Sequence, residues 1–599
     1  MHILGVSCFY HDSAAALVRD GVLVAAAEEE RFSRKKHDNG FPRLAIDFCL
    51  RQAGLHGAEL DYVVFYEKPL VKFERVLMSA MGTVPRSWRV FGEAMINYAD
   101  EKLWIKSILM RELGLAANRV LFTDHHVSHA ASAMFASPFE QAAILTVDGV
   151  GEWTTGAIGK GTANWDGRAG GGKNAIELWQ ELRFPHSVGL LYSAFTAYLG
   201  FEVNEGEYKV MGMAPYGQPR YVDQVHQVVR LAQDGSIEIN LDYFSYHHSA
   251  TQTYNARFVE LFGPARKPES EFFTLTTHPA RNHPRWDERA AAESQRFADV
   301  AASIQVVTEE IILRMAQTAH EKTGLDKLVM AGGVALNSVA NGRLMRESAF
   351  KDIYIQPAAG DSGGALGAAL YAYHVLLGRP RCFVQEHNYW GEEYSEEQME
   401  QAIQARGFPY ERIDDTERLL DRAVDTMLAG KVIGWFYGRF EWGPRALGNR
   451  SILADPRRAE MKDIVNTKIK FREPFRPFAP VIPEERAAEY FTTPGLDKQY
   501  PPRFMLVVSP FREEVRERVQ AVCHAGGTGR MQTVRREWNP AYYRLVEKFG
   551  QATGVPVLMN TSFNLRGEPI VTTPLDALKT FGNSGIDRLA MGPFWVGKP

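Results

Sequence analysis

The 599-residue sequence has only four cysteines, no long apolar run and no excess of basic residues. The cysteines are far apart and form no C-x-x-C pair, so they favour neither a disulfide framework nor a zinc knuckle. No stretch of about 18 apolar residues occurs, and the opening MHILGVSCFYHDS is too polar for a signal peptide. We therefore expect a cytoplasmic protein that has no membrane partner.

The charge balance argues against a polyanionic partner. Lysine and arginine number 68 against 72 aspartate and glutamate residues, which gives a net charge of −4. Proteins that bind DNA or RNA usually carry a basic excess, so we do not expect nucleic acid as a partner. The length exceeds what a single hydrophobic core serves and predicts several domains of ordinary globular composition.

Three predicted strand ends carry an acidic residue beside glycine or other small residues, near Asp12, Asp148 and Asp361. Strands are predicted in HILGVSC, in AAALVRDGVLVAAAEEE with a hairpin turn at Asp20-Gly21, and in AAILTVDGVGEWTTGAIG. Such bends expose backbone N–H groups that can hold phosphate, while the carboxylate can hold a metal. One Asp-Gly is usually only a turn. Three of them, together with the turn in KLVMAGGVALN, indicate an actin-like, sugar-kinase-like ATPase fold.

The predicted organisation is α/β throughout. We expect an actin-like domain at 1–380 with an insertion at about 217–296, a linker at 381–400, and a second α/β domain at 401–599. Apolar residues at helical spacing predict an amphipathic helix over 297–318. In the second domain we expect a helix around 416–429 followed by a strand at 431–438.

The stretch DHHVSH at 124–129 has two interpretations. It is either a polar helix start capped by Asp124 or Thr123, or part of a metal site. In a helix, His125 and His129 are four residues apart and share one face. Together with Asp148 and Asp361 they would suit a divalent transition metal such as iron or manganese. His126 points off that face, and we expect it to be a capping or surface residue.

A cationic cluster marks the second domain. Ten basic and five acidic residues lie between 439 and 476. Clustered guanidinium groups offset the repulsion between anionic substrates and stabilise charge on a phosphoryl group. The alternative is a solvated basic face. Proline and glycine in EWGPRALGNRS and KFREPFRPF argue against it, because they hold these basic residues in fixed loops.

Long motifs in the sequence resemble a known family. FYHDSAAALVRDG, EEERFSRKKHD, HHVSHAASAMFASPF, ILTVDGVGEW, NEGEYKVMGMAPYG and FREPFRPFAPVI are similar to those of the O-carbamoyltransferases that modify antibiotics and nodulation factors. The resemblance extends from residue 2 to about 597. It implies an actin-like domain similar to the tRNA threonylcarbamoyl-transfer protein, fused to a twisted α/β domain similar to its carbamoyl-adenylate-forming partner.

The resemblance also implies a reaction in two stages. The C-terminal domain would convert carbamoyl phosphate and ATP to carbamoyl-adenylate and pyrophosphate. The N-terminal domain would bind the adenylate through a divalent metal, with Fe²⁺ expected and Mn²⁺ or Mg²⁺ as alternatives. It would then transfer the carbamoyl group to a hydroxyl of a small natural product and release AMP. A homodimer is compatible with this resemblance.

The same resemblance implies roles for individual residues. The metal ligands would be His125, His129, Asp148 and Asp361. The catalytic residues would be Asp12, which would face the acceptor, with Lys470, Arg476 and His524. ATP, the adenylate and carbamoyl phosphate would be bound by Lys36, Gly149, Gly151, Gly332, Gly333, Asn337, Arg445, Thr528, Arg530, Asn560 and Ser562.

The sequence departs from the family pattern in one segment. The family usually has H-x-D-G-T-A-R, whereas residues 524–530 read HAGGTGR, so Gly526 replaces the acid and Gly529 the alanine.

Two other functions compete with carbamoyl transfer. A metal-dependent hydrolase would need H-E-x-x-H, but His126 follows His125. A non-catalytic nucleotide-binding regulator would leave the cationic cluster unexplained.

Overall fold

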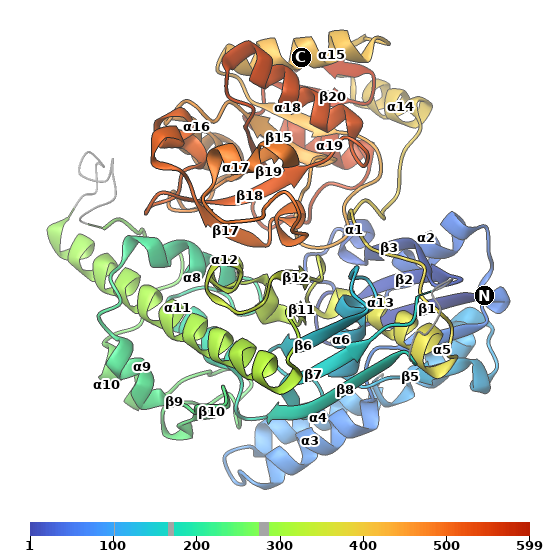
Figure 1. The fold of residues 1–599 in the computed structure, drawn as a ribbon, viewed down its shortest axis with the longest axis vertical. Coiled ribbons are helices and arrows are strands. Elements are labelled where there is room, and N and C mark those ends of the chain that lie inside the picture. Colours follow the sequence, from blue (N-terminus) through green and yellow to red (C-terminus); the bar gives the residue numbers. More distant parts are fainter. Residues whose placement is uncertain (101, 166–172, 275–286) are drawn as a thin grey trace. The chain divides into compact units, whose positions relative to one another are not determined.

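The structure is a computed structural model that describes residues 1–100, 102–165, 173–274 and 287–599 (Figure 1). The chain divides into two compact units. The first contains Met1–Gly5, Gly57–Asp352 and Gly367–Cys382, and the second contains Val6–His56, Ile353–Leu366 and Phe383–Pro599. The divisions pass through the continuous strand β1 (His2–Ser7) and the continuous helix α13 (Asp361–Tyr371). The domain limits drawn from the sequence stay a prediction.

Two five-stranded sheets repeat one strand order, β3-β2-β1-β4-β5 and β8-β7-β6-β11-β12. In the first sheet β2 and β3 are antiparallel, and β4 and β5 are parallel. In the second sheet β6, β7 and β8 are antiparallel, and β6 and β11 are parallel. This repeat confirms the predicted actin-like α/β class. The strands are β2 (Ala14–Arg19), β3 (Val22–Glu28), β4 (Tyr62–Phe65), β5 (Val120–Phe122), β6 (Gln141–Val147), β7 (Thr154–Thr162), β8 (Ala175–Arg183), β11 (Lys327–Ala331) and β12 (Asp352–Ile355).

The turn between β2 and β3 has the geometry that its sequence predicts. Asp20 and Gly21 have φ values of 49° and 83°. Left-handed conformations at both central residues are typical of the two-residue turn that matches the twist of paired strands. The predicted Asp-Gly hairpin is therefore confirmed.

The long helix α11 (Glu288–Thr323) begins earlier than predicted. Asp287 caps it by accepting hydrogen bonds from the backbone N–H groups of Arg289 (2.7 Å) and Ala290 (3.3 Å). The first residues, ERAAAESQR, carry no apolar stripe, so hydrophobic periodicity locates only the later turns. Residues 288–296, assigned to the insertion by sequence, thus belong to this helix, and 275–286 lie outside the described residues.

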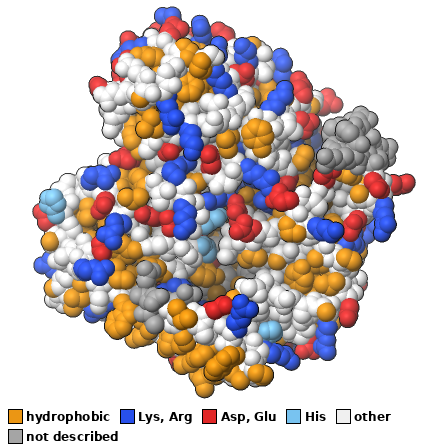
Figure 2. All heavy atoms as spheres, turned by 180° about the vertical axis from the view of Figure 1, so that it is seen from behind, with side chains coloured by type: hydrophobic (Ala, Val, Ile, Leu, Met, Phe, Trp, Pro, Cys, Tyr) orange, Lys and Arg blue, Asp and Glu red, His pale blue; other side chains and the backbone are white. Residues whose placement is uncertain are grey.

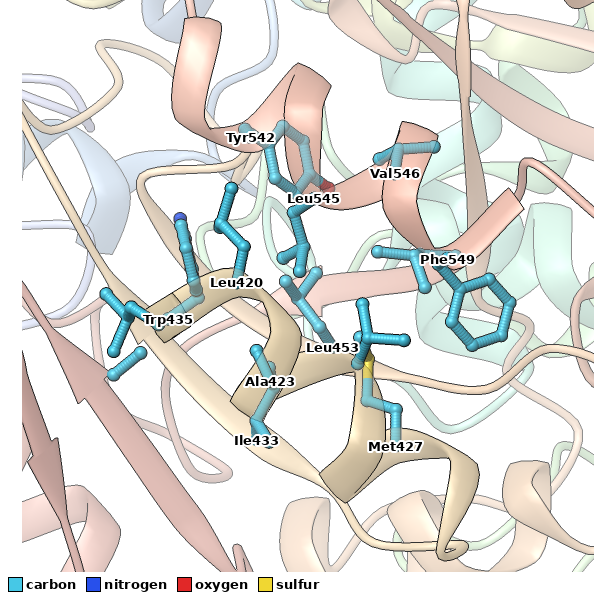
Figure 3. Packing of buried hydrophobic residues seen from close by; sticks show 14 of the residues in the cluster. Leu420, Ala423, Met427, Ile433, Trp435, Leu453, Tyr542, Leu545, Val546 and Phe549 are labelled. Carbon is cyan, nitrogen blue, oxygen red and sulfur yellow. The ribbon is translucent and has the colours of Figure 1, made fainter. Parts of the chain in front are cut away.

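The second unit contains a nine-stranded sheet in the order β13-β21-β20-β14-β15-β19-β16-β18-β17. Helix α15 (Thr416–Leu428) and strand β14 (Ile433–Phe436) confirm the predicted helix and strand. Figure 3 shows the core between α15 and α18 (Pro540–Thr553), where Leu420 and Met427 lie among Leu545, Val546 and Phe549. The other strands are β13 (Tyr410–Arg412), β15 (Arg450–Ala454), β16 (Ala479–Pro483), β17 (Val507–Pro510), β18 (Thr528–Val534), β19 (Leu558–Ser562), β20 (Arg588–Met591) and β21 (Phe594–Val596).

The remaining described helices connect these strands. They are α1 (Glu30–Ser33), α2 (Arg43–Ala53), α3 (Pro69–Met81), α4 (Trp88–Asp100), α5 (Ile105–Leu113), α6 (His125–Met134), α7 (Val188–Tyr198), α8 (Glu207–Met213), α9 (Val222–Val228), α10 (Ala256–Phe262), α12 (Ser338–Glu347), α14 (Glu396–Arg406), α16 (Met461–Ile464), α17 (Ala487–Tyr490) and α19 (Pro574–Gly582). A short hairpin of β9 (Val229–Leu231) and β10 (Ile237–Ile239) lies in the predicted insertion. Within the described part of the chain, no helix combines the length and the apolar character that crossing a bilayer requires.

Candidate active site

Helix α6 begins at the histidine pair. His125 and His129 lie one turn apart and are both buried, and their Nε2 atoms are 3.1 Å from each other. Asp148, the residue after β6, places Oδ2 3.2 Å from His125 Nε2 and 3.8 Å from His129 Nε2. Because α6 precedes β6 directly, the short connection brings the helix start to the strand end. The two imidazoles and one carboxylate predicted as ligands therefore converge.

Asp361 completes the group. It is the first residue of α13, a single helix whose residues from Gly367 onward belong to the same unit as α6. One ligand atom from each of Asp361, Asp148, His125 and His129 lies within 4.8 Å of the others, and all four residues are buried. Two imidazole nitrogens and two carboxylate oxygens form a donor set that suits a divalent transition metal. The arrangement fits the predicted metal site, and the roles of the ligands stay a prediction.

A buried ion pair behind His125 was not predicted from the sequence. Glu67, just beyond β4, places Oε2 3.6 Å from His125 Nδ1 and accepts a 2.7 Å hydrogen bond from Lys72 Nζ. Burial alone would raise the pKa of Glu67, but the charge of Lys72 and the contact with His125 outweigh it and hold that pKa at about 2. A carboxylate behind a ligating imidazole fixes its orientation. The signal was a strand followed by an acid, the same pattern that identified Asp148.

The start of α6 is capped differently from either predicted cap. Glu152 accepts hydrogen bonds from the His125 backbone N–H at 3.1 Å to each carboxylate oxygen. Asp124 makes no side-chain cap and instead pairs with Lys68 Nζ at 2.9 Å. The interpretation of Asp124 or Thr123 as the capping side chain is therefore wrong, because a carboxylate from the β6–β7 turn occupies that position.

His126 was expected at the surface or at the cap, and this expectation is wrong. It is 3% exposed, and its Nδ1 lies 2.8 Å from Thr146 Oγ1 on β6. Burial, followed by the charges of His125 and His129, lowers the pKa of His126 to about 3. The ring is a neutral core group that ties α6 to β6.

The glycines predicted to contact nucleotide surround Asp148. Gly333 donates its backbone N–H to Asp148 Oδ1 at 2.8 Å. Gly332 has a φ of 97°, and a Cβ there would lie 2.2 Å from Val147 O. A Cβ on Gly151 would lie 2.8 Å from the His125 ring, so two backbone turns approach the site closely only because they lack side chains.

Gly149 and Asn337 have other structural contacts. Gly149 O accepts a 2.6 Å hydrogen bond from Ser187 Oγ, at the start of α7. Asn337 Oδ1 caps α12 by accepting from the Ala340 N–H at 3.1 Å, and it also accepts from Gln305 Nε2 at 3.1 Å. These residues border the Asp148 turn, and their contact with nucleotide stays a prediction.

The second unit contains a buried cation, Lys470, at the end of a π-helix at Val465–Lys470. Lys470 is 3% exposed, and its Nζ donates to Ser562 O, to Ser562 Oγ at 3.2 Å and to Asn564 Oδ1 at 2.7 Å. Burial, then the charges of Arg472 and Arg476, lower the pKa of Lys470 well below its usual range. Like charges gathered in a buried position favour binding of an anion there.

The neighbouring predicted residues come from separate elements. Arg476 Nη1 lies 3.5 Å from Glu473 Oε2, and the Arg476 side chain is 18% exposed. Asn560 on β19 donates to Ala446 O at 3.1 Å and to Gln532 Oε1 at 2.7 Å. Ser562 ends β19, two strand positions after Asn560. Arg445 is half-buried in the loop before β15.

His524, Thr528 and Arg530 flank a tight turn. The His524 N–H donates to Thr528 O at 2.7 Å, and Gly526 and Gly527 between them have φ values of 85° and 74°. Burial, then the charge of Arg530, lowers the pKa of His524 to about 3, and its Nε2 lies 3.3 Å from Phe478 O. His524 is therefore a neutral imidazole in this structure.

The segment around Asp12 belongs to the second unit. Asp12 lies between two imidazoles, with Oδ1 2.7 Å from His37 Nδ1 and Oδ2 2.9 Å from His11 Nδ1. Burial would raise the pKa of Asp12, but these two contacts outweigh it and lower that pKa below its usual range. Lys36 lies close enough to Lys470 that its charge also lowers the pKa of that lysine. The partner of Asp12, His37, was missed because 25 residues separate the two in sequence.

Comparison with known proteins gives matches along most of the chain. The family model of the carbamoyltransferase N-terminus matches residues 2–370, and that of the carbamoyltransferase C-terminus matches residues 424–598. The uncharacterized protein sll1178 of Synechocystis sp. is 46% identical, with 100% of this chain and 97% of that protein covered. The nodulation protein NolNO of Sinorhizobium fredii is 39% identical, with 98% and 79% covered.

A relative with a named activity matches part of the chain. The 3'-hydroxymethylcephem-O-carbamoyltransferase of Amycolatopsis lactamdurans is 32% identical over 51% of this chain and 55% of that enzyme. Both halves of the chain match models of this family. The chain belongs to the carbamoyltransferase family and is an enzyme of that class.

Proposed function

We propose that this enzyme is an ATP-dependent O-carbamoyltransferase that acts on a hydroxyl of a small natural product. The observation that carries the proposal is Lys470, a buried lysine beside Arg472 and Arg476, in a chain that also contains a buried group of histidines and aspartates. The cationic position suits phosphate-bearing substrates, and the histidine–aspartate group suits a divalent metal, which we propose to be Fe²⁺.

In the first stage the second unit would make the activated group. Water and carbamoyl phosphate give carbamate and inorganic phosphate, and a carbamate oxygen then attacks the α-phosphorus of ATP, so that pyrophosphate leaves and carbamoyl-adenylate forms. Lys470 and Arg476 would offset the phosphate charges that must approach each other. The anions would be oriented by Arg445, Thr528, Arg530, Asn560 and Ser562. The neutral imidazole of His524 would accept or donate a proton.

In the second stage the carbamoyl group passes from the adenylate to the acceptor oxygen, and AMP leaves. His125, His129, Asp148 and Asp361 would hold the metal. When bound, a divalent cation can polarise a carbonyl or phosphoryl oxygen. The nucleotide would be contacted by Gly149, Gly151, Gly332, Gly333, Asn337 and Lys36. The Glu67–Lys72 ion pair would keep the His125 ring in one orientation.

We assign the acceptor's proton to His37, with Asp12 as its positioning residue. Asp12 is a poor base, because its two imidazole contacts lower its pKa. When His37 donates its Nδ1–H to Asp12, its Nε2 is a proton acceptor, as in other imidazole–carboxylate pairs. Among the described residues no group donates to this buried Nε2 atom. The His37 side chain as a whole is 31% exposed, so a change of its side-chain rotamer would open Nε2 to the acceptor hydroxyl, which would donate to it and then lose its proton to it.

The class of acceptor is proposed from a relative. The name 3'-hydroxymethylcephem-O-carbamoyltransferase describes transfer to the oxygen of a hydroxymethyl group. Mass spectrometry with ¹³C-labelled carbamoyl phosphate, ATP and a panel of hydroxylated natural products tests the proposal. We expect one acceptor to gain one labelled carbamoyl group, with AMP and pyrophosphate formed in step. Formation of ADP alone, or no label in any acceptor, would contradict it.

A further inference from the structure

Helix α3 buries two cationic side chains and leaves three large apolar side chains exposed. Lys72 and Arg75 are buried on its inner face, where Lys72 pairs with Glu67 and Arg75 lies over the Phe184 ring at 5.1 Å. Leu70, on the outer face, is 72% exposed. An ordinary surface helix points its apolar stripe inward. The ion pair behind His125 occupies part of the inner face of α3, and Leu70, Met78 and Met81 are exposed away from it.

Helix α4 continues the same surface. Trp88 and Ile96 are two helical turns apart on one stripe and are 71% and 64% exposed. Of the thirteen exposed large apolar side chains among the described residues, seven lie between 70 and 104. We call them the α3–α4 surface: Leu70, Met78, Met81, Val84, Trp88, Ile96 and Trp104. Figure 1 labels α3 and α4 at the lower end, and Figure 2 shows hydrophobic side chains gathered there.

The size of this surface is that of a protein interface. A tryptophan side chain buries about 150–250 Å², and the five other side chains of this surface are somewhat smaller. The seven side chains, each more than half exposed, therefore offer roughly 700 Å², close to the ~800 Å² per partner of a standard interface. Tryptophan and methionine are also the residue types enriched at such interfaces.

Acidic and basic charges are nearly balanced beside the surface among the described residues. Glu74 and Glu93 are acidic, and Arg86, Arg89 and Lys106 are basic. A surface that binds anionic lipid needs an excess of lysine and arginine. A two-fold contact between identical surfaces needs self-complementarity, in which Glu74 of one copy can meet an arginine of the other. This balance favours a protein partner that carries the same surface.

We propose that the α3–α4 surface pairs with the same surface of a second copy of this chain to form a two-fold dimer. The contact covers Met78 and Trp88 and leaves the inner face of α3, with Lys72 and Glu67, inside each copy. This inference does not depend on the proposed reaction.

Sedimentation velocity of the full chain over a range of concentrations tests the dimer. We expect twice the 67.3 kDa chain mass. Substituting Met78→Glu and Trp88→Glu together should weaken dimerisation at least about 30-fold, the effect of losing an interface hot spot. The milder pair Met78→Ala and Trp88→Ala should weaken it in the same direction without introducing charge.

The matched control is Trp179→Glu, a substitution at a 45% exposed tryptophan on β8, which should leave the dimer unchanged. A monomer at every concentration would overturn the proposal, and so would a dimer that both α3–α4 double variants leave intact. A monomer that binds vesicles of anionic phospholipid would overturn it in favour of a membrane as occupant.

Discussion

At the residue scale, His125 has contacts on three sides at the candidate metal site. Its backbone N–H donates to Glu152, its Nδ1 faces Glu67 and its Nε2 faces Asp148. Gly151 lies close to the ring, and a Cβ there would be 2.8 Å from it. A ligand whose orientation is fixed by its surroundings binds metal without further ordering.

The metal assignment predicts different effects for two buried histidines of α6. The substitution His129→Gln should remove most of the bound iron or manganese, measured by inductively coupled plasma mass spectrometry of the purified protein. His126→Gln is the control, because His126 contacts Thr146 and is not among the four converging ligands. Equal metal content in His129→Gln and the unsubstituted enzyme would rule out this site.

The role of His37 predicts a separation of two activities. His37→Asn keeps an N–H near the position that contacts Asp12 but removes the Nε2 acceptor, whereas His37→Gln removes the contact with Asp12. We expect both variants to lose transfer at least about 100-fold, the usual contribution of a general base, while pyrophosphate release persists. Undiminished transfer in His37→Asn would show that His37 has only a structural role.

At the element scale, the departure from the family pattern at 524–530 has a local cause at one position. Gly529 lies on β18, and a Cβ there would be 2.6 Å from the Phe511 ring. Phe511 itself stacks on Phe491, with ring centroids 4.4 Å apart. The usual alanine would therefore not fit against this aromatic pair, whereas Gly526 has open space around it.

This steric relation predicts a rescue. Gly529→Ala should lower the free energy of unfolding by about 1–3 kcal/mol, as overpacking of a core does. In a double-mutant cycle measured by thermal denaturation, Phe511→Leu should recover part of that loss, because the smaller side chain makes room for the methyl group. An unchanged melting temperature for Gly529→Ala alone would contradict the clash.

The end of β3 predicts a pH dependence of stability. Burial is the largest cause that raises the pKa of Glu28 from 4.5 to about 7, and the charge of Arg31 offsets it only in part. The folded chain then holds an extra proton between these pH values. This contribution to stability is complete below pH 4.5 and is lost as pH rises through 7.

The free energy of unfolding should fall by about 3 kcal/mol over that pH interval. Glu28→Gln should make the free energy of unfolding nearly independent of pH in this interval. The amide oxygen can still accept the hydrogen bond that the Gly443 N–H donates to Glu28 at 2.7 Å. Thermal denaturation between pH 4.5 and 7.5 measures the effect, with the exposed Glu514→Gln as the control. A decline with pH that survives in Glu28→Gln would refute this explanation.

Sequence predicts the elements of the fold better than its long-range contacts. The β2–β3 hairpin, the start of α6 and the α15–β14 unit follow from turn residues and periodicity, which are local. The His125–His129 pair follows from helical spacing. Glu67 behind His125, Glu152 on its backbone and His37 beside Asp12 are tertiary contacts, and a local pattern such as an acid after a strand does not say which residue they meet.

At the scale of the whole molecule, two kinds of chemistry are assigned to different groups of residues. The histidines with Asp148 and Asp361 suit a metal, whereas Lys470 and Arg476 suit anions. Loss of the metal group should therefore leave pyrophosphate release intact, whereas loss of the cationic group should also stop transfer, because no adenylate is made. Lys470→Met should stop both pyrophosphate release and transfer, whereas Lys468→Met, at an exposed lysine of the same π-helix, should stop neither.

The most direct test follows pyrophosphate release and carbamoylation of the acceptor together in His129→Gln. We expect this variant to release pyrophosphate from ATP in the presence of carbamoyl phosphate, while carbamoylation of the acceptor falls to background. If His129→Gln loses pyrophosphate release as well, or if it still carbamoylates the acceptor, the division of the reaction between a metal site and a cationic site is contradicted.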